Sequence, residues 1–510
     1  SSFATLLSLL HRQVIGATVT TWNEELETPF VYMKEQSSAG DVSTVDVISP
    51  ASPFYLYLAP ETLRLMLLPL LEYSANLTYI RYNLPWAPHH LGDWPVCNIL
   101  PEEQEQMPME ETGNMLIMLA AIAQRQQGQV EYLNKYSDLL QIWANYLNES
   151  LPDPENQLCT DDFEGPSPHN ANLAMKGIIG LGAYSIILKY QGDVSRSEYY
   201  LSQAVAYAYQ WIDLAKDVED VHDLPHFRLE YDKNGTWSMK YNLFWQYVLD
   251  LNIFPDAVRQ IELAYYQTKS NKFGVPLDSR GTLAKCDSTL WIASMYDLHS
   301  EQQQMMLNHI YQFAHETPTR IPISDVYDTS NNEAIFFTAR PVMGGLHSIA
   351  LLNQQKVQKM MTDIVKSVTS FEFIACSKCE LSDRYGPDNG YNCHPIGDTE
   401  NVVCTCPDNS YQTDKRCRIC DAENICGNPS IACAETGIFP DGSLFACFCS
   451  NGLTSYGKAC DESSLITTVS PPEATTATTP TSTTTTATSI STAMDLPQRT
   501  SVKKLKNIFF

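Results

Sequence analysis

Two pairs of adjacent carboxylates in the first third of the chain are the strongest candidates for hydrolytic chemistry. Glu110 and Glu111 lie in MPMEETGN, directly before an apolar segment, and Asp161 and Asp162 lie in NQLCTDDFEG. Carboxylates with different pKa values can share the proton transfers of a hydrolysis, one as base and one as acid. Alternatively, these residues have only structural roles: the glutamates would stabilise the first turn of a helix, and the aspartates would form a turn or cap a helix. Because neighbouring residues on a helix point about 100° apart, at most one glutamate is expected to reach a pocket.

Charged residues that could bind a substrate are concentrated in other polar segments. NKFGVPLDSRGTLAKCDSTLW, ETPTRIPISDVYDT and ARPVMGG combine acids and bases with Gly and Pro. Basic side chains in such segments can form charge-assisted hydrogen bonds to a carboxylate. The candidates for substrate binding are Lys34, His89, Asp278, Arg280, Lys285, Asp287, Asp325 and Arg340.

A cysteine nucleophile is a weaker alternative. Cys159 precedes the paired aspartates, but no histidine stands at a recognisable spacing to activate it. We favour a small buried residue, or a disulfide partner for Cys97 or Cys286. No metal ion and no cofactor are expected.

The segments that carry these residues have mostly helical spacing. In VEYLNKYSDLLQIWANYLNES the apolar positions recur at intervals of three and four, which predicts one buried helix face. The N-terminal SSFATLLSLLHRQV also favours a helix over a signal peptide. Further helices are predicted at 60–74, 112–127, 171–190, 195–216, 241–250, 255–269, 286–297, 301–315 and 344–366.

Long polar loops at 81–110, 151–170, 220–240 and 316–343 alternate with short turns. Antiparallel helix pairs with long loops gathered at one end predict a mainly α fold, an α/α toroid. A functional site is expected at the long-loop end.

The fifteen cysteines are concentrated toward the C-terminus. Twelve divide into two sets of six, in 371–418 and 419–461, and each set ends in C-x-C, ten further residues and a last Cys. Segments of this size with few large apolar side chains depend on disulfides, which require an oxidising compartment. Zinc is the alternative, but C-x2-C spacing occurs only at Cys376/Cys379 and Cys417/Cys420.

The C-x-C pattern resembles EGF-like modules. That resemblance implies pairing of the first cysteine with the third, the second with the fourth and the fifth with the sixth. The implied disulfides are Cys376–Cys393, Cys379–Cys404, Cys406–Cys417, Cys420–Cys433, Cys426–Cys447 and Cys449–Cys460. Such modules also suggest an extracellular protein partner.

The last part of the chain, 462–510, contains a Thr-rich tract with Ser, Pro and Ala. Its composition predicts an extended, O-glycosylated, mucin-like stalk. N-glycosylation acceptors at Asn76, Asn148 and Asn234 fit the same setting. We therefore expect a secreted or cell-surface protein.

The net charge of −26 argues against a nucleic-acid partner, because phosphate backbones would be repelled. No segment has the roughly 18–20 consecutive apolar residues of a membrane span, so none is expected.

Several of these segments together resemble the glutaminase A family of fungi and bacteria. They are MKEQSSAGDVSTVDVISPASPFYLY, MPMEETGNMLIMLAA, DPENQLCTDDFEG, NLAMKGIIGLGAY and ARPVMGG. The resemblance implies a six-hairpin toroid over 1–370 that hydrolyses the side-chain amide of glutamine or a related small molecule. In this family a β-rich domain normally precedes the helical one, whereas this sequence starts in the helical part.

Departures from the family pattern leave other functions open. Relatives usually read Pro-His-Asp-Leu-Gly where this chain has His90 in third place, and Lys-x-Asp-Trp where it has Ser288 in fourth. If the missing aspartate is the base, the domain binds without catalysis, as in an adhesion or recognition protein. A glycoside hydrolase is the remaining alternative, with a sugar stacked on Trp86, Trp94, Trp237 or Trp245.

Overall fold

The computed structural model describes residues 2–75, 82–217, 224–319, 322–335 and 337–354, and six short strands between 392 and 456. The α-helices are α1 (Ser2–Gly16), α2 (Val45–Leu58), α3 (Pro60–Ser74), α4 (Pro108–Arg125), α5 (Ser137–Ser150), α6 (Ala171–Tyr190), α7 (Val194–Ala215), α8 (Phe244–Val248), α9 (Asp256–Gln267), α10 (Cys286–Met295) and α11 (Glu301–Glu316). The 3-10 helices are η1 (Pro101–Glu103), η2 (Glu131–Tyr136), η3 (Asp162–Glu164), η4 (Tyr241–Leu243) and η5 (Pro341–His347), and η5 continues as a helix over 348–354.

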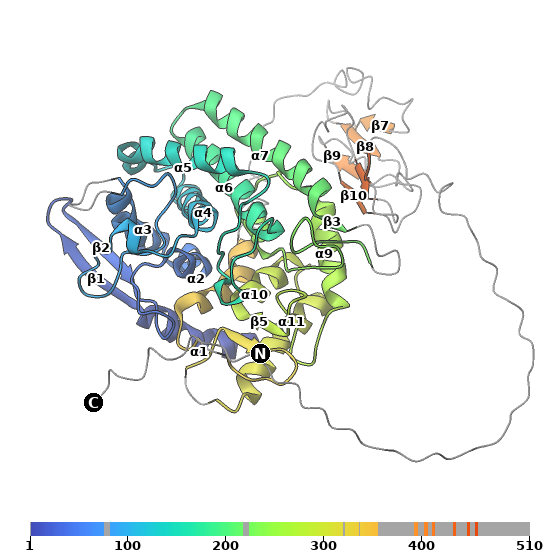
Figure 1. Cartoon of the computed structure of the whole chain (residues 1–510). Coiled ribbons are helices and arrows are strands. Elements are labelled where there is room, and N and C mark those ends of the chain that lie inside the picture. The colour runs from blue at the N-terminus through green and yellow to red at the C-terminus, as the bar shows by residue number, and fades with distance from the viewer. Residues whose placement is uncertain are drawn as a thin grey trace, which may run out of the picture. The chain divides into compact units, whose positions relative to one another are not determined.

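Burial divides the helices into an inner and an outer ring. In α2, α4, α6 and α10 the side chains are buried almost all round, as expected for helices enclosed by others. In α5, α7, α9 and α11 only one face is buried. Figure 1 shows the first group toward the centre of the helical body and the second around it.

The inner ring closes on itself. α2 contacts α4, α4 contacts α6, α6 contacts η4, η4 contacts α10, and α10 contacts η5, which returns to α2. The return requires glycine, because a Cβ on Gly344 would lie 2.6 Å from the carbonyl oxygen of Ala51 in α2. The predicted α/α toroid is therefore confirmed, and the ARPVMGG motif carries the contact that closes it.

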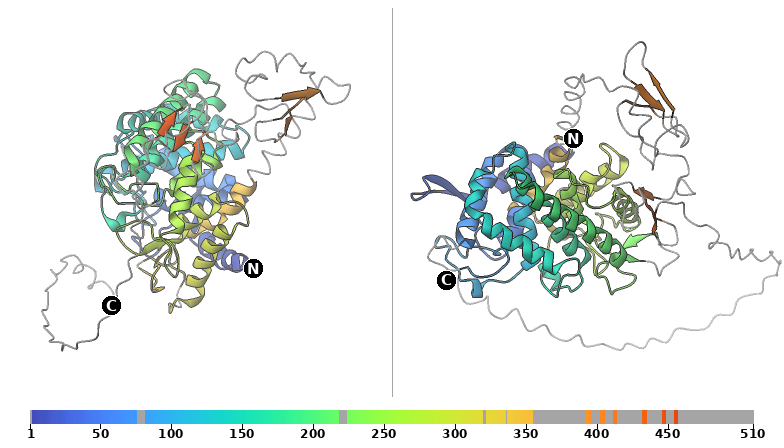
Figure 2. Two further views of the ribbon diagram at one scale, coloured as in Figure 1. Left: turned by 90° about the vertical axis from the view of Figure 1, so that its right-hand side faces the viewer. Right: turned by 90° about the horizontal axis from the view of Figure 1, so that it is seen from above.

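Most predicted helices are present, and α3 and α6 have the predicted ends. α2 was not predicted, because Pro50 and Pro53 interrupt its sequence. The prediction of almost no strand missed a hairpin of β1 (Thr18–Asn23) and β2 (Thr28–Met33), which projects from the helices in Figure 2.

Four further short strands belong to the loops of the helical part. They are β3 (Lys216–Asp217) with β4 (His226–Phe227), and β5 (Leu283–Lys285) with β6 (Val326–Asp328). The second pair joins the loop before α10 to the loop before η5. It therefore fixes two of the polar segments that were predicted to carry a site.

Each cysteine-rich segment contains one antiparallel three-stranded sheet. The first has β7 (Asn392–Pro395), β8 (Val402–Thr405) and β9 (Tyr411–Thr413); the second has β10 (Ala432–Ala434), β11 (Ala446–Phe448) and β12 (Thr454–Tyr456). Cys393 is opposite Cys404, and Cys433 is opposite Cys447, in the strand register. The six implied disulfides, the EGF-like assignment and the stalk involve residues outside the described ones and stay predictions, as do the domain boundaries.

By length and composition α6 could cross a membrane, although the sequence was expected to contain no such segment. In the structure 94% of the relevant window is buried among the other helices. α6 is therefore a core helix of the toroid.

Candidate functional site

A polar cavity of about 440 Å³ opens where several inner-ring loops meet. We call it the acidic pocket, because six carboxylates line it: Glu35, Asp41, Asp46, Glu103, Glu105 and Asp162. The basic groups on its wall are His89, His90 and Arg340. These residues come from the segment after β2, the start of α2, the 82–107 loop, η3 and the residue before η5, so the cavity lies among the long loops where a site was expected.

Asp46 and His89 form an acid–histidine pair in this pocket. The Nε2 atom of His89 lies 3.3 Å from Asp46 Oδ1, and both side chains are almost fully buried. Burial opposes the charge on His89, but the hydrogen bond and charge of Asp46 outweigh it and raise the pKa of the imidazole. Burial likewise opposes the charge on Asp46, and His89 reverses the effect, so the pKa of Asp46 is lowered.

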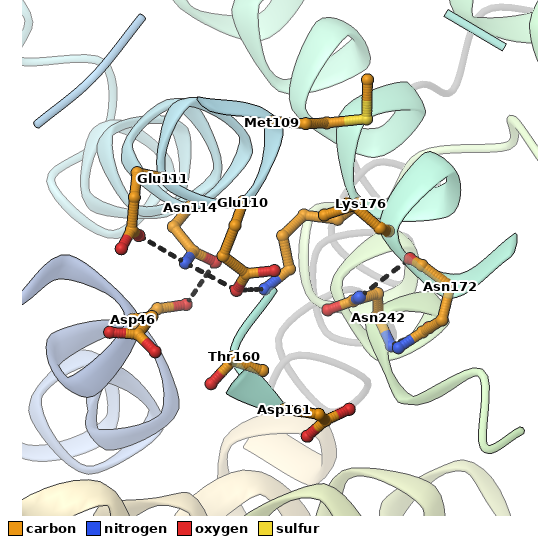
Figure 3. Close-up of polar contacts among 12 residues, drawn as sticks. Asp46, Met109, Glu110, Glu111, Asn114, Thr160, Asp161, Asn172, Lys176 and Asn242 are labelled. Carbon is orange, nitrogen blue, oxygen red and sulfur yellow. Dashed lines mark hydrogen bonds and ion pairs between the residues drawn. The ribbon is translucent and has the colours of Figure 1, made fainter. Parts of the chain in front are cut away.

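The two candidate glutamates point in different directions from the first turn of α4, as Figure 3 shows. Glu110 forms a buried ion pair with Lys176 of α6. Glu111 Oε1 lies 3.7 Å from His89 Nε2. Asn114 joins the two glutamates, donating to Glu110 Oε1 at 3.0 Å and to Glu111 Oε2 at 3.1 Å.

The pKa of Glu111 is raised well above its usual value, first by burial and then by the charges of Asp46 and Glu110. Its carboxyl group therefore holds its proton to a higher pH than an ordinary glutamate does. Neither glutamate lines the acidic pocket. The wall of the acidic pocket carries Asp46 and His89 instead, and a catalytic role for either glutamate stays a prediction.

The adjacent aspartates Asp161 and Asp162 also lie in different surroundings. Asp162 lines the acidic pocket, and burial raises its pKa to about 6, with a further contribution from Asp46. Asp161 accepts a hydrogen bond from Tyr241 Oη at 2.8 Å and lies 3.6 Å from the amine of Lys285. Of this pair, only Asp162 lines the acidic pocket.

A second, much smaller cavity of about 10 Å³ has Glu110, Asp161, Asp278 and Arg280 on its wall. That volume holds about one water molecule. Arg280 is committed to a bidentate pair with Asp278, with donor–acceptor distances of 3.1 and 2.6 Å. These residues therefore lie apart from the wall of the acidic pocket, and their predicted catalytic and substrate-binding roles stay predictions.

The remaining basic candidates differ in how far they are already paired. Lys285 donates to the carbonyl and hydroxyl oxygens of Thr160, both at 3.1 Å, besides its contact with Asp161. Arg340 is buried, lines the acidic pocket and approaches Asp325 only to 3.8 Å. Lys34 is half-buried and is not part of the pocket wall.

Asp287 and Asp325 lie behind the pocket wall rather than on it. Both are buried, and burial raises the pKa of Asp287 to about 6. Their charges act on Arg340, whose pKa is raised despite its burial. They are positioning groups for the cation.

His90, which replaces the aspartate of the family pattern, has a carboxylate beside it. Its Nδ1 atom accepts from the Gly92 amide at 3.0 Å and lies 3.2 Å from Asp41 Oδ1. Burial and then the charge of His89 lower the pKa of His90 to about 4, so its ring is neutral at neutral pH. Burial raises the pKa of Asp41 to about 6. The pocket thus retains a carboxylate next to the substituted position.

Cys159 is not a nucleophile. It is buried and free, and burial raises the pKa of its thiol far above the usual range. Cys97 and Cys286 are also free, so the predicted disulfide alternative is wrong for these three residues.

Most of the tryptophans proposed for sugar binding are too buried to stack on a sugar ring. Trp237 and Trp245 are 8% and 0% exposed, and Trp86 donates its indole N–H to Gln106 at 2.7 Å. Of the four, only Trp94 is exposed, at 40%.

Of the predicted glycosylation sites, Asn234 lies exposed in a turn. Asn148 lies within α5 with its side-chain oxygen buried, which counts against modification there. Asn76 is outside the described residues.

Asp46, His89 and Glu111 offer one ligand atom each within 4.8 Å of one another, as a metal site would. The Nε2 atom of His89 faces both carboxylates, and Asp46 already compensates its charge. We therefore describe the cluster as an acid–histidine pair backed by a glutamate of raised pKa.

Residues 1–350 match the family model of the glutaminase A six helical-hairpin domain. The chain belongs to this family. Glutaminase A of Aspergillus oryzae (strain ATCC 42149 / RIB 40) is 37% identical over 357 residues, which are 69% of this chain and 50% of the relative. A probable glutaminase of Arthroderma benhamiae (strain ATCC MYA-4681 / CBS 112371) is 27% identical over 451 residues, 71% of this chain and 51% of the relative. The chain thus spans about half the length of these curated family members.

Among solved structures, a metal-independent α-mannosidase of Streptococcus pneumoniae is similar at 11% identity and a TM-score of 0.46, covering 69% of this chain and 94% of the other. The GH63 mannosylglycerate hydrolase of Thermus thermophilus is similar at 9% identity and a TM-score of 0.45, with coverage of 69% and 100%.

Five carboxylates of the pocket were missed from the sequence: Asp41, Glu103, Glu105 and the two most deeply buried, Glu35 and Asp46. Both lie in the segment 33–57 that carries the family resemblance, so that segment was the available signal. Asp46 also stands in the first turn of a helix, where an acid is ordinarily explained by the helix dipole.

Proposed function

We propose that this chain hydrolyses the side-chain amide of glutamine, or of a closely related amide, to a carboxylate and ammonia. The relatives named glutaminases support the reaction class. The observation that carries the proposal is one pocket wall with both a carboxyl group of raised pKa, Asp162, and a histidine of raised pKa, His89, that lies 3.3 Å from Asp46.

The two groups divide the proton transfers. Above pH 6 Asp162 is ionised and accepts a proton from a water molecule as the water oxygen attacks the amide carbon. His89 donates its proton to the amide nitrogen, so that the C–N bond breaks and ammonia leaves. The products are the side-chain carboxylate and ammonium after proton equilibration. To complete the cycle, Asp162 releases its proton to solvent and His89 takes one up, and the carboxylate of Asp46 again balances the positive charge of the imidazolium.

The test is ammonia release from L-glutamine by the purified chain. We expect Asp162→Asn and His89→Gln to lower kcat by about 100-fold or more, the usual contribution of a general base or acid. Asp232→Asn is the matched control, because Asp232 is an exposed turn residue remote in sequence from the pocket. Full activity in both pocket variants would contradict the mechanism.

Aryl glycosides are assayed in parallel. Hydrolysis of a glycoside without ammonia release from glutamine would replace the proposal with the glycosidase alternative.

We also propose that the protein works outside the cell, displayed through its cysteine-rich and Thr-rich segments. The support is compositional: twelve cysteines in two similar sets, each with one small antiparallel sheet. Secretion of a tagged full chain into the medium or to the cell surface tests it, and retention in the cytosol would contradict it.

A further inference from the structure

The segment 89–92, which includes both histidines of the acidic pocket, is held along one edge by the backbone before α2. The Val45 amide donates to the His89 carbonyl oxygen at 2.8 Å. Two further backbone hydrogen bonds, both of 2.9 Å, join the segment to Val42. Because Asp46 follows Val45 in the chain, this pairing brings its carboxylate next to the imidazole of His89.

A side chain holds the other edge of the segment. The backbone amides of His89 and His90 donate to no backbone carbonyl group in the described part of the chain, and both donate to Gln104 Oε1, at 3.0 and 3.4 Å. Gln104 is 6% exposed, and a buried backbone N–H without an acceptor is unfavourable. One amide oxygen with two lone pairs therefore fixes the backbone of two consecutive residues.

Tyr73 of α3 sets the orientation of the Gln104 amide group. Tyr73 donates its single hydroxyl proton to the Ile99 carbonyl oxygen at 3.0 Å, which leaves the hydroxyl oxygen as an acceptor. Gln104 Nε2 donates to that oxygen at 2.7 Å. With its nitrogen facing Tyr73, the amide of Gln104 turns its oxygen toward the two backbone N–H groups.

We propose that Gln104 is a positioning residue for the histidine of the acidic pocket: by holding the backbone of His89, it keeps the imidazole against Asp46. The inference rests on the proposed function for the role of His89 as proton donor. Gln104 is not on the pocket wall, so it acts through His89 and not on the substrate.

The surroundings of His89 show what a loss of positioning would change. The charged groups that share its neighbourhood are Asp46, Glu111, Glu35, Glu105, His90 and Arg340. Burial lowers the pKa of His89, and Asp46 makes the largest of the contributions that raise it. An imidazole that moves away from Asp46 should therefore titrate at lower pH.

Gln104→Leu removes the acceptor and keeps a side chain of similar size. We expect kcat for ammonia release from L-glutamine to fall about 10- to 100-fold, as a small misplacement of a reacting group does. KM should stay within about two-fold of wild type, because no substrate contact is removed. The pKa of His89, followed by NMR of its Cε1–H signal, should fall by about one pH unit. The signal is assigned by its absence from His89→Gln.

Two further variants separate the acceptor from the rest of the side chain. Gln104→Glu keeps an oxygen for both backbone amides, so kcat should stay within a few-fold of wild type. Its negative charge lies near His89, so the pKa of His89 should not fall. Tyr73→Phe frees the Gln104 amide to turn, and it should lower kcat and the pKa of His89 by less than Gln104→Leu does. If Gln104→Leu does not fold, Tyr73→Phe decides the question.

Gln124→Leu is the matched control. Gln124 also holds a backbone group with its side chain, because its Nε2 donates to the Leu249 carbonyl oxygen at 2.8 Å, but it lies at the end of α4 remote from Glu111. Gln124→Leu should leave kcat and the pKa of His89 unchanged, even where it lowers Tm as much as Gln104→Leu.

The two readouts separate the inference from the proposed function. Gln104→Leu with wild-type kcat, or with an unchanged pKa of His89, would overturn the inference and leave the function standing. An equal fall in kcat in Gln104→Leu and Gln124→Leu would also overturn it, because the effect would then be a general loss of stability. No ammonia release by the wild type, together with a lower pKa of His89 in Gln104→Leu, would overturn the function and uphold the positioning of His89 by Gln104.

Discussion

Glu110 and Glu111 are adjacent, identical in type and both buried, yet their replacement by Gln should have opposite consequences. Glu110 is 1% exposed and forms an ion pair with Lys176, which is 2% exposed. Glu110→Gln leaves the lysine charge buried without its partner. Breaking a buried pair in this way costs about 3–5 kcal/mol of unfolding free energy.

The expected change in melting temperature follows from the size of the domain. Unfolding entropy of about 2.1 cal/mol/K per residue over about 350 residues gives roughly 0.7 kcal/mol/K. A loss of about 3–5 kcal/mol therefore lowers Tm by about 4–7 °C. By contrast, Glu111→Gln should not destabilise the fold at neutral pH, because the raised folded-state pKa of Glu111 already lowers the stability of the wild type as pH rises above 4.5.

The pH dependence of the Glu111 variant tests the protonation directly. A carboxyl group whose pKa is raised in the folded state holds a proton that the unfolded chain releases above pH 4.5. Its contribution to stability is therefore present at low pH and lost as pH rises toward the folded pKa. Relative to wild type, Glu111→Gln should gain up to about 1.4 kcal/mol per pH unit across that window.

Denaturant unfolding of wild type and both variants at pH 5 and pH 7 provides the measurement. Equal destabilisation by the two substitutions at pH 7 would refute the assigned charge states. A Glu111→Gln difference that stays constant with pH would refute the raised pKa.

Three further outcomes are expected. The pH profile of kcat/KM should rise through about pH 6 as Asp162 ionises, and it should fall above the raised pKa of His89. Asp46→Asn removes the charge that raises the pKa of His89, so the alkaline limb of the profile should move to lower pH. An alkaline limb that does not move would exclude His89 as its source. Gly344→Ala should lower stability by about 1–3 kcal/mol, since its Cβ would clash with α2, whereas Gly281→Ala, with open space around it, should be neutral in the same melt. Thiol titration of the secreted, denatured chain should find three free thiols; fifteen would rule out the disulfide framework.

The sequence predicts the helices of the toroid best where one face is polar, because apolar and polar residues then alternate with the helical period. It predicts them least well where every face is buried. α7 and α11 show clear periodicity because their outer faces meet solvent. α2 is buried along nearly its whole length and contains Pro50 and Pro53, so neither periodicity nor propensity marks it. Its helix depends on contacts with α4 and η5, which are distant in sequence.

The sequence identifies some residues of the pocket, but it does not show which charged residues form ion pairs with one another. Asp162, His89 and Arg340 were identified from residue type and local sequence, and all three line the acidic pocket. Whether a charge is available to a ligand depends on its neighbours in the fold: Arg280 is neutralised by Asp278, two residues away. Lys285, by contrast, is held by Thr160, 125 residues away.

The charge balance of the buried site connects these results. Where a base lies near a buried carboxylate, as Lys176 does for Glu110, the two form a fixed structural pair. Glu111 and Asp162 have no such fixed partner, and burial raises their pKa values, so they hold protons to a higher pH than ordinary carboxyl groups. Arg340 is a third case, because it lies 3.8 Å from Asp325, and the charges of Asp325 and Glu35 raise its pKa despite its burial. The buried acids are thus balanced either by a fixed base or by a bound proton, which is why replacing Glu110 should disturb the fold more than replacing Glu111.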